Sequence, residues 1–172
     1  IYRGRVLKEF KGCDIRPTSD MTRESLFNIL RNKVQGCVFL DLFCGTGAVG
    51  IEAISRGAKK VVFNDVSAES VFLTKNNLSK LGIDDGVEVR CGDANAFIES
   101  CNQKFDIIFI DAPYSSKAGE NALNSVDKIL ADGGIVVYEN EKATDQTYCG
   151  LKKYDDRRYG RAYLTFFERE HQ

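Results

Sequence analysis

The chain has 172 residues, 43% of them hydrophobic, and its 24 basic and 25 acidic residues give a formal net charge of −1. A chain of this length can bury the core of one α/β domain, and no apolar run approaches the ~18 residues that a membrane-spanning helix needs. The near-neutral charge excludes a global basic field, so recognition of a nucleic acid would depend on local clusters.

Cysteine and histidine usage argues against metal and disulfide chemistry. The 6 cysteines contain no C-x-x-C pair, and we expect reduced core thiols in a cytoplasmic protein, in place of disulfides or zinc ligands. The single histidine, His171, lies in a polar tail, so neither a histidine-based triad nor a metal site is expected. The chain begins at Ile1, and we expect its native start to lie further upstream.

The first elements predicted along the chain are a hairpin and a helix. Residues 1–18 are predicted to form a short basic β-hairpin extension, with a strand over Arg5–Phe10 that turns at Gly12. Ser19 or Asp20 can cap the helix that follows, because both side chains accept hydrogen bonds from a first helical turn. This helix carries an apolar stripe of Leu26, Phe27, Ile29 and Leu30.

Strands and helices then alternate. We expect strands in the runs around Val38, Val61, Val87, Phe105 and Ile135–Tyr138, and helices over Val49–Arg56, Ala68–Leu81, Ala94–Ser100 and Gly119–Leu130. Such alternation is typical of a Rossmann-like α/β fold, with a mostly parallel twisted sheet and helices on both faces. The final elements are predicted to be an antiparallel hairpin of Leu151–Tyr154 and Ala162–Phe167.

A glycine-rich turn follows the strand around Val38. Gly45-Thr46-Gly47-Ala48-Val49-Gly50 fits the pattern G-x-G-x-x-G, in which glycines allow a tight turn and close approach of a ligand to a helix N-terminus. Asp65 ends the next apolar run, 20 positions after Gly45, where a carboxylate would meet ribose hydroxyls. These two features serve a nicotinamide dinucleotide and S-adenosylmethionine equally well.

Three further features favour the methyl donor. Asp41, 4 residues before Gly45, would repel a pyrophosphate but suits the cationic amino group of a methionine moiety. Asp93, after the strand around Val87, can meet the adenine amine. The next strand delivers Asp111 to the same carboxyl edge, where ligands of open α/β sheets bind.

The tetrapeptide Asp111-Ala112-Pro113-Tyr114 directly follows the apolar run Phe105–Ile110. Taken alone it is also an ordinary exit from a strand into a turn. Considered together with the acidic residues at the ends of the other strands, the tetrapeptide predicts an amine-binding site. The Asp111 carboxylate and the Ala112 carbonyl can accept both hydrogens of a planar amine, while the Tyr114 ring stacks on the attached base. Pro113 restricts Ala112 to extended conformations.

Four segments carry a family resemblance: Ile15–Asp20, Arg23–Leu30, Asp41–Gly47 and Asp111–Tyr114. Together they are similar to the bacterial 16S ribosomal RNA guanine-N2 methyltransferases of the RsmD type, over nearly the whole chain. The family usually has proline where this chain has Ala112, which predicts a less preorganised loop with the same chemistry. The resemblance implies a single class I methyltransferase domain over residues 1–172.

The resemblance also implies the cofactor and its contacts. S-adenosylmethionine is the expected donor and S-adenosylhomocysteine the product. Phe43 and the backbone of Gly45, Thr46 and Gly47 would cradle the methionine part, Asp65 the ribose, and Asp93 with Ala94 the adenine. Asp41 would face the amino group, and no metal is required.

The expected partner is ribosomal RNA in a partly assembled small subunit, bound by a monomeric enzyme without a membrane partner. Basic residues cluster near both ends of the chain, and the residues assigned to RNA contact are Arg5, Lys8, Arg157 and Arg158. The resemblance adds Arg16 and Thr18 near the donor or target. Two alternatives stay open: an amino-methyltransferase for DNA adenine, DNA cytosine or protein glutamine, and, more distantly, a nicotinamide-dependent oxidoreductase or a nucleotide-binding module.

Overall fold

The computed structural model describes residues 19–144 and 146–171. The predicted N-terminal hairpin lies outside these residues, as do four of the residues assigned to RNA contact: Arg5, Lys8, Arg16 and Thr18.

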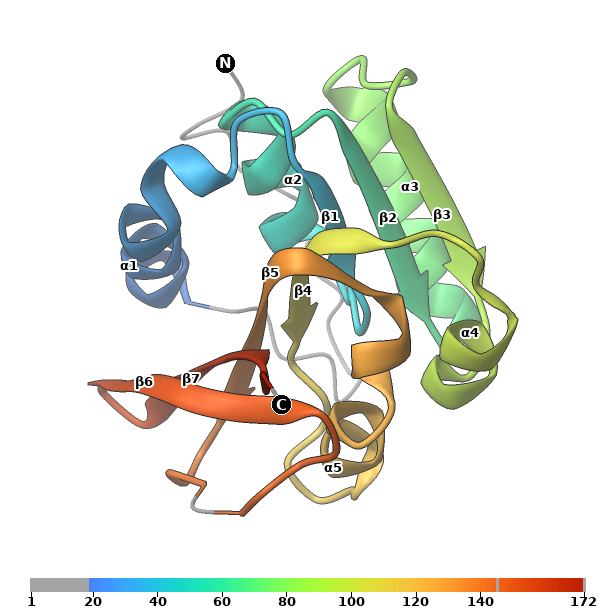
Figure 1. Cartoon of the computed structure of the whole chain (residues 1–172). Coiled ribbons are helices and arrows are strands. Elements are labelled where there is room, and N and C mark those ends of the chain that lie inside the picture. The colour runs from blue at the N-terminus through green and yellow to red at the C-terminus, as the bar shows by residue number, and fades with distance from the viewer. Residues whose placement is uncertain (1–18, 145, 172) are drawn as a thin grey trace.

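In the described part of the chain, the strands form one seven-stranded sheet in the order β3-β2-β1-β4-β5-β7-β6 (Figure 1). The first five strands are parallel to one another, and β7 pairs antiparallel with both β5 and β6. This confirms the predicted parallel sheet with a C-terminal antiparallel hairpin. The strands are β1 (Val38–Asp41), β2 (Lys60–Asp65), β3 (Val87–Cys91), β4 (Phe105–Ile110), β5 (Leu130–Asn140), β6 (Leu151–Tyr159) and β7 (Ala162–Arg169).

Helices cover both faces of the sheet, because successive residues of the buried strands point to opposite sides. Phe39 and Leu40 of β1 belong to two different core clusters. The first cluster includes side chains of α1, α2 and α3, and the second includes side chains of α4 and α5. The helices are α1 (Asp20–Leu30), α2 (Ala48–Ser55), α3 (Ala68–Lys80), α4 (Ala94–Ser100) and α5 (Ala118–Leu123), with 3-10 turns η1 (Arg31–Lys33) and η2 (Val126–Ile129).

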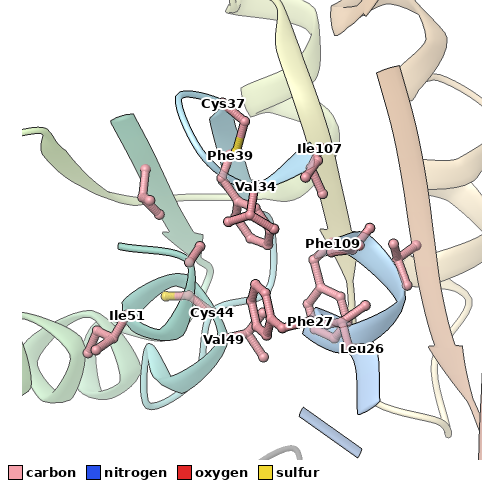
Figure 2. Packing of buried hydrophobic residues seen from close by; sticks show 14 of the residues in the cluster. Leu26, Phe27, Val34, Cys37, Phe39, Cys44, Val49, Ile51, Ile107 and Phe109 are labelled. Atoms are coloured by element: carbon pink, nitrogen blue, oxygen red, sulfur yellow. The ribbon is translucent and has the colours of Figure 1, made fainter. Parts of the chain in front are cut away.

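Helix α1 begins and packs as its sequence predicts. The Ser19 hydroxyl accepts a hydrogen bond from the backbone N–H of Thr22 at 3.2 Å and so caps the helix. Phe27 stacks on Phe39 of β1, with ring centroids 6.1 Å apart (Figure 2). α1 is therefore fixed to the face of the sheet that also carries α2.

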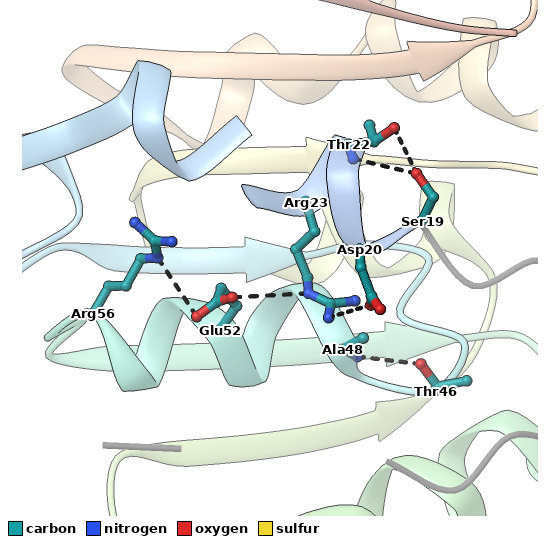
Figure 3. A network of polar contacts seen from close by, with 8 residues as sticks. All are labelled: Ser19, Asp20, Thr22, Arg23, Thr46, Ala48, Glu52 and Arg56. Atoms are coloured by element: carbon teal, nitrogen blue, oxygen red, sulfur yellow. Dashed lines mark hydrogen bonds and ion pairs between the residues drawn. The ribbon is translucent and has the colours of Figure 1, made fainter. Parts of the chain in front are cut away.

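A chain of ion pairs joins α1 to α2 (Figure 3). Glu52 of α2 lies between two arginines, 3.8 Å from Nε of Arg23 and 3.5 Å from Nε of Arg56. All three side chains are largely buried, so the pairs are less screened by solvent than exposed ones would be. They hold α1 beside the helix that follows the glycine turn.

The single helix predicted over Gly119–Leu130 is wrong. α5 ends at Leu123, η2 follows, and Leu130 already belongs to β5. The cause lies at Asn124 and Ser125, whose side chains donate to the carbonyls of Glu120 and Asn121, 3.2 and 3.3 Å away. Such local hydrogen bonds from side chains to backbone carbonyls compete with the continuation of the helix.

The last hairpin is longer than predicted. β6 continues to Tyr159 through a run of charged residues, with a register shift between Lys153 and Asp155. Because most side chains of this edge strand are exposed, charge does not oppose the strand. Among the described residues no helix is long and apolar enough to cross a membrane, and no group of side chains could hold a metal ion.

Candidate active site

A cleft with a volume of about 650 Å³ lies at the carboxyl ends of the parallel strands. Its walls come from the loops after β1, β2, β3 and β4 and from α5. The lining residues are Phe43, Gly45, Asn64, Asp65, Val66, Ser67, Ser70, Gly92, Asp93, Ala94, Asn95, Asp111, Ala112, Pro113, Ser116, Ala118 and Asn121. The sheet thus brings together most of the site residues predicted from four separate segments.

Asp65 ties the glycine turn to the end of β2. One carboxylate oxygen accepts the N–H of Gly45 and the other that of Ser67, both at 2.9 Å. Each oxygen keeps a second lone pair, and the half-buried side chain lines the cleft. Asp65 is therefore held in place by the backbone and can still accept hydroxyl hydrogens from a ligand.

Asp41 lies beneath the turn and not among the residues that line the cleft. Its side chain is 1% exposed and accepts the backbone N–H of Gly50 at 3.1 Å. Burial raises the pKa of Asp41 from 3.8 to about 7, the bond from Gly50 opposes this rise, and the nearby charge of Asp65 adds to it. A carboxyl that titrates near neutrality thus supports the first turn of α2 from below.

The remaining residues of the turn pack inward. A Cβ at Gly47, whose φ is +83°, would come within 2.9 Å of the Thr74 side chain of α3, and one at Gly50 within 2.2 Å of the Phe63 ring. Thr46 is buried, and its hydroxyl accepts the N–H of Ala48 at 3.3 Å (Figure 3). Thr46 and Gly47 were assigned to cofactor contact, but of the predicted cradle only Phe43 and Gly45 line the cleft.

The loop after β3 forms the next part of the wall. Asp93 caps α4 by accepting the N–H of Ala96 at 3.0 Å, and Asp93 and Ala94 both line the cleft. The adjacent Gly92 has open space where a side chain would start, since a Cβ there would meet nothing within 4 Å. Of the two residues assigned to adenine, Asp93 is thus exposed on an open section of the wall, whereas Ala94 is buried.

Nine of the lining residues were not predicted, and two of them, Asn64 and Val66, have unusual environments. Asn64 is 2% exposed, and its amide donates to the carbonyls of Leu42 at 3.3 Å and Gly92 at 3.1 Å. It thereby joins the loops after β1 and β3, and its only sequence signal is an amide inside an apolar run. Val66 lines the cleft although it is 70% exposed, an unusual position for an apolar side chain directly after Asp65.

The segment after β4 closes the cleft. Asp111, Ala112 and Pro113 line it, whereas the half-buried Tyr114 is not among the lining residues. Ser116 closes the turn, with its N–H and hydroxyl both 3.1 Å from the carbonyl of Pro113.

The floor beneath this segment is tightly packed. A Cβ at Gly119 would lie 2.9 Å from the Tyr138 ring and 3.3 Å from the Ala112 side chain. Burial raises the pKa of Tyr138 to about 12, with smaller contributions from Tyr148, Glu120 and Asp111. The phenol is therefore neutral under ordinary conditions, and α5, β5 and the Asp111 loop form one packed unit.

Arg157 and Arg158 do not line this cleft. Both are exposed on β6, where Arg157 lies 3.0 Å from Asp155 and the Arg158 guanidinium lies over the Tyr163 ring at 5.6 Å. The structure therefore separates these two basic residues from the acidic strand ends, and places them on the hairpin.

Known proteins resemble this chain over most of its length. The family model described as "Conserved hypothetical protein 95" matches residues 1–168. Ribosomal RNA small subunit methyltransferase D of Escherichia coli strain K12 is 33% identical over 143 residues, covering 81% of this chain and 71% of that protein. The protein of the same name in Haemophilus influenzae is 31% identical over 147 residues, covering 83% and 76%.

Solved structures share the fold. The structure of yhhF from Escherichia coli has a TM-score of 0.86 at 27% identity, and covers 99% of this chain and 95% of that chain. The ribosomal protein L11 methylase of Lactobacillus delbrueckii subsp. bulgaricus has a TM-score of 0.70 at 22% identity, and covers 88% and 78%. The predicted class I methyltransferase fold is thus confirmed.

Proposed function

The chain belongs to the family described as conserved hypothetical protein 95, and from this membership we propose that it methylates small-subunit ribosomal RNA with S-adenosylmethionine as donor. Relatives that match most of the chain are named ribosomal RNA small subunit methyltransferase D. We further propose a single catalytic domain over residues 1–172 and, as the target, the exocyclic N2 amine of a guanine.

One observation carries the proposal. Three carboxylates at the ends of three different strands, Asp65, Asp93 and Asp111, line one cleft together with Ala112. A site of this kind offers acceptors for an adenine amine at Asp93, ribose hydroxyls at Asp65 and a target amine at Asp111, in that order along the sheet edge.

The donor set of the cleft suits a cation better than a polyphosphate. S-adenosylmethionine supplies a methyl group on a positively charged sulfonium, which makes that carbon electrophilic. The carboxylates at this edge attract such a charge and would repel the pyrophosphate of a nicotinamide dinucleotide. The apolar side chains of Phe43 and Val66 suit the flat and aliphatic parts of the donor.

The proposed chemistry uses few groups of the protein. A guanine amine is a weak nucleophile because its lone pair is delocalised into the ring. The Asp111 carboxylate and the Ala112 carbonyl accept the two amine hydrogens and direct the lone pair toward the methyl carbon. The new carbon–nitrogen bond forms as the carbon–sulfur bond breaks, and one proton then leaves the nitrogen, with Asp111 as the nearest acceptor.

Orientation supplies most of the acceleration in this scheme. Alignment of nucleophile and methyl group for in-line displacement can lower a barrier by several kcal/mol, up to roughly 7–11 kcal/mol in the best intramolecular cases. The base has to leave its stack to reach a recessed carboxylate, and the Tyr114 ring provides a stacking surface for it.

The test is detection of the modified nucleotide by mass spectrometry. RNA, DNA and protein fractions are isolated from cells with and without this chain and are incubated with purified enzyme and isotopically labelled S-adenosylmethionine. N2-methylguanosine in small-subunit RNA from the deficient cells is the expected product. Label in DNA or in protein glutamine would overturn the RNA assignment in favour of the matching amino-methyltransferase.

Binding measurements test the donor separately. S-adenosylmethionine and S-adenosylhomocysteine should raise the midpoint of thermal unfolding, as ligands selective for the folded state do. NAD should leave it unchanged. A shift with NAD and none with either adenosyl ligand would favour the nicotinamide alternative.

A further inference from the structure

A second cleft, with a volume of about 450 Å³, lies between the end of α1 and the β6–β7 hairpin. Helix α1 with η1 supplies one wall and β6 supplies the other. The lining residues are Ser25, Asn28, Ile29, Arg31, Arg157 and Tyr159. This lining offers two guanidinium groups and neutral hydrogen-bonding side chains, and none of its members within residues 19–144 and 146–171 is a carboxylate.

Arg31 has a strained backbone conformation in this cleft. Its φ of +45° is the only positive value at a non-glycine residue among the described residues. Its Nε donates to the carbonyl of Asn28 at 3.2 Å, which anchors the side chain at the end of α1. A helix C-terminus is a favourable place for a cation, but a glycine would terminate the helix here without the strain. Strain of this kind is typical of functional positions.

Arg157 of the hairpin lines the same cleft as Arg31. Its Nε lies 3.0 Å from the Asp155 carboxylate, an exposed pair that orients the guanidinium while neutralising part of its charge. The other charged groups of this part of β6 are Asp156, which bonds to Thr165 at 3.1 Å and lies 3.7 Å from Lys153, and Arg158, which lies over Tyr163.

The register of the sheet places the hairpin tip on the edge that carries Asp111. Tyr138 of β5 pairs with Ile110, the residue before Asp111, and Asn140 at the end of β5 pairs with Tyr163. Tyr163 in turn pairs with Arg158 of β6. Three strand spacings separate β4 from β6, a distance of about 15 Å. An extended polynucleotide chain bound in the first cleft can reach the hairpin across this distance.

We propose that the Arg31–Arg157 cleft binds a backbone phosphate of the substrate RNA. This inference rests on the proposed function, which supplies a polyanionic substrate. Guanidinium groups match the oxygens of a phosphate in a bidentate manner, and hydroxyl and amide side chains such as Ser25 and Asn28 commonly complete phosphate contacts. The contact positions the RNA and carries no base specificity.

Direct binding tests the inference apart from catalysis. The probe is a fluorescently labelled single-stranded RNA oligonucleotide, titrated with the full chain at several salt concentrations. Arg31→Gln and Arg157→Gln should each weaken RNA binding roughly tenfold, the loss expected for one charged hydrogen bond. Each should also lower the slope of log Kd against log salt by about 0.7. Lys75→Gln, the same charge change on an exposed residue of α3, should do neither.

Two further variants exclude a general effect on folding. Arg31→Gly should keep or raise the midpoint of thermal unfolding, since glycine accepts a positive φ without strain, and should weaken RNA binding like Arg31→Gln. Arg157→Lys keeps the charge but not the planar fork, so it should recover only part of the affinity. S-adenosylmethionine affinity should be unchanged in all of these variants.

The outcomes separate the cleft from the proposed reaction. RNA binding that is indifferent to both glutamine substitutions overturns the phosphate site, even when the enzyme methylates RNA. Binding of inorganic phosphate that depends on Arg31, with RNA affinity unchanged, overturns the RNA assignment of the cleft. Arg31-dependent RNA binding by a chain that transfers no methyl group supports the site and contradicts the proposed function.

Discussion

At the residue scale, the carboxyl group of Asp41 differs from the other acidic groups at this sheet edge in its burial. Asp65, Asp93 and Asp111 all reach the cleft, whereas Asp41 is enclosed beneath the glycine turn with Gly50 as its hydrogen-bond donor. An enclosed carboxylate is costly to charge, so the donor's positive charge and the charge of Asp41 should stabilise each other across the loop.

Asp41 should make stability depend on pH. Its pKa is raised to about 7 by burial, so between pH ~4 and 7 the folded protein keeps a proton that the unfolded chain releases. Stability contributed by this group is present below that window and is lost as pH rises through it. Asp41→Asn keeps an acceptor for the N–H of Gly50 but does not titrate. As pH rises from 4 to 8, the free energy of unfolding of this variant, relative to that of the parent chain, should therefore increase by ~2–4 kcal/mol.

Urea unfolding of both chains at the two pH values measures this difference. Asp132→Asn, at an exposed position near the start of β5, removes one acidic side chain without touching the core and serves as the control. A difference between Asp41→Asn and the parent chain that stays constant with pH would show that the buried carboxyl does not titrate in this range.

The residues around Asp111 should separate chemistry from donor binding. Asp111→Ala is expected to abolish methyl transfer with little change in S-adenosylmethionine affinity, because its proposed partner is the target amine. Tyr114→Phe should retain more activity than Tyr114→Ala, since loss of base stacking costs ~1–3 kcal/mol. Ala112→Pro should be tolerated. Single-turnover rates and donor Kd values check this, and full turnover by Asp111→Ala would remove the central assignment.

Individual residues also mark what the sequence could predict. Asp65, Asp93 and Asp111 could be assigned because the carboxyl ends of parallel strands meet at one edge. Asn64 could not, because its role is to join two loops that only the fold brings together. Gly47 fits a ligand-binding pattern, yet the space it leaves is occupied by Thr74.

At the element scale, α2 packs so closely against the sheet that no space remains for a methyl side chain at Gly50. Gly50 faces the Phe63 ring of β2, and the first turn of α2 is tied to Asp41 by a hydrogen bond. The glycine pattern is therefore largely a packing requirement between a helix and a strand, and the turn is positioned by that packing.

Two glycine substitutions should separate packing from ligand contact. Gly50→Ala forces the Phe63 ring to move, since its Cβ would lie 2.2 Å from the ring, and overpacking of this kind costs roughly 1–3 kcal/mol or more. Gly92→Ala has open space and should leave the unfolding midpoint nearly unchanged, while weakening donor binding in the cleft. Equal thermal stability of the two variants would contradict the packing account.

The order of elements was predictable, whereas some boundaries were not. Apolar runs ending in acids indicated the parallel strands, but the break at Asn124 and Ser125 depends on side chains that bond back to carbonyls of α5. The charged run at the end of β6 carries no strand signal of its own, and it is a strand because β7 pairs with it.

At the scale of the whole molecule, the protein presents two unlike surfaces. The acidic cleft lies over β1 to β4, and the basic cleft lies beside β6. With a net charge of −1, the protein lacks a long-range field that would draw RNA to it. Recognition should therefore depend on a few local phosphate contacts and on the shape of the substrate.

This balance leads to a prediction about the form of the RNA. A small-subunit particle whose ribosomal proteins hold the target region in place should be methylated faster than protein-free ribosomal RNA. Naked RNA should bind weakly and with strong salt dependence, because each phosphate contact releases counterions. Charge reversal at Arg157 and Arg158 should raise KM more than it lowers kcat, since both residues lie outside the acidic cleft. Steady-state assays on both substrates at two salt concentrations measure this. Equal rates on naked RNA and on the particle would show that the enzyme recognises the RNA without the shape that ribosomal proteins give it. Unchanged kinetic constants in the charge-reversal variant would place RNA recognition on another surface.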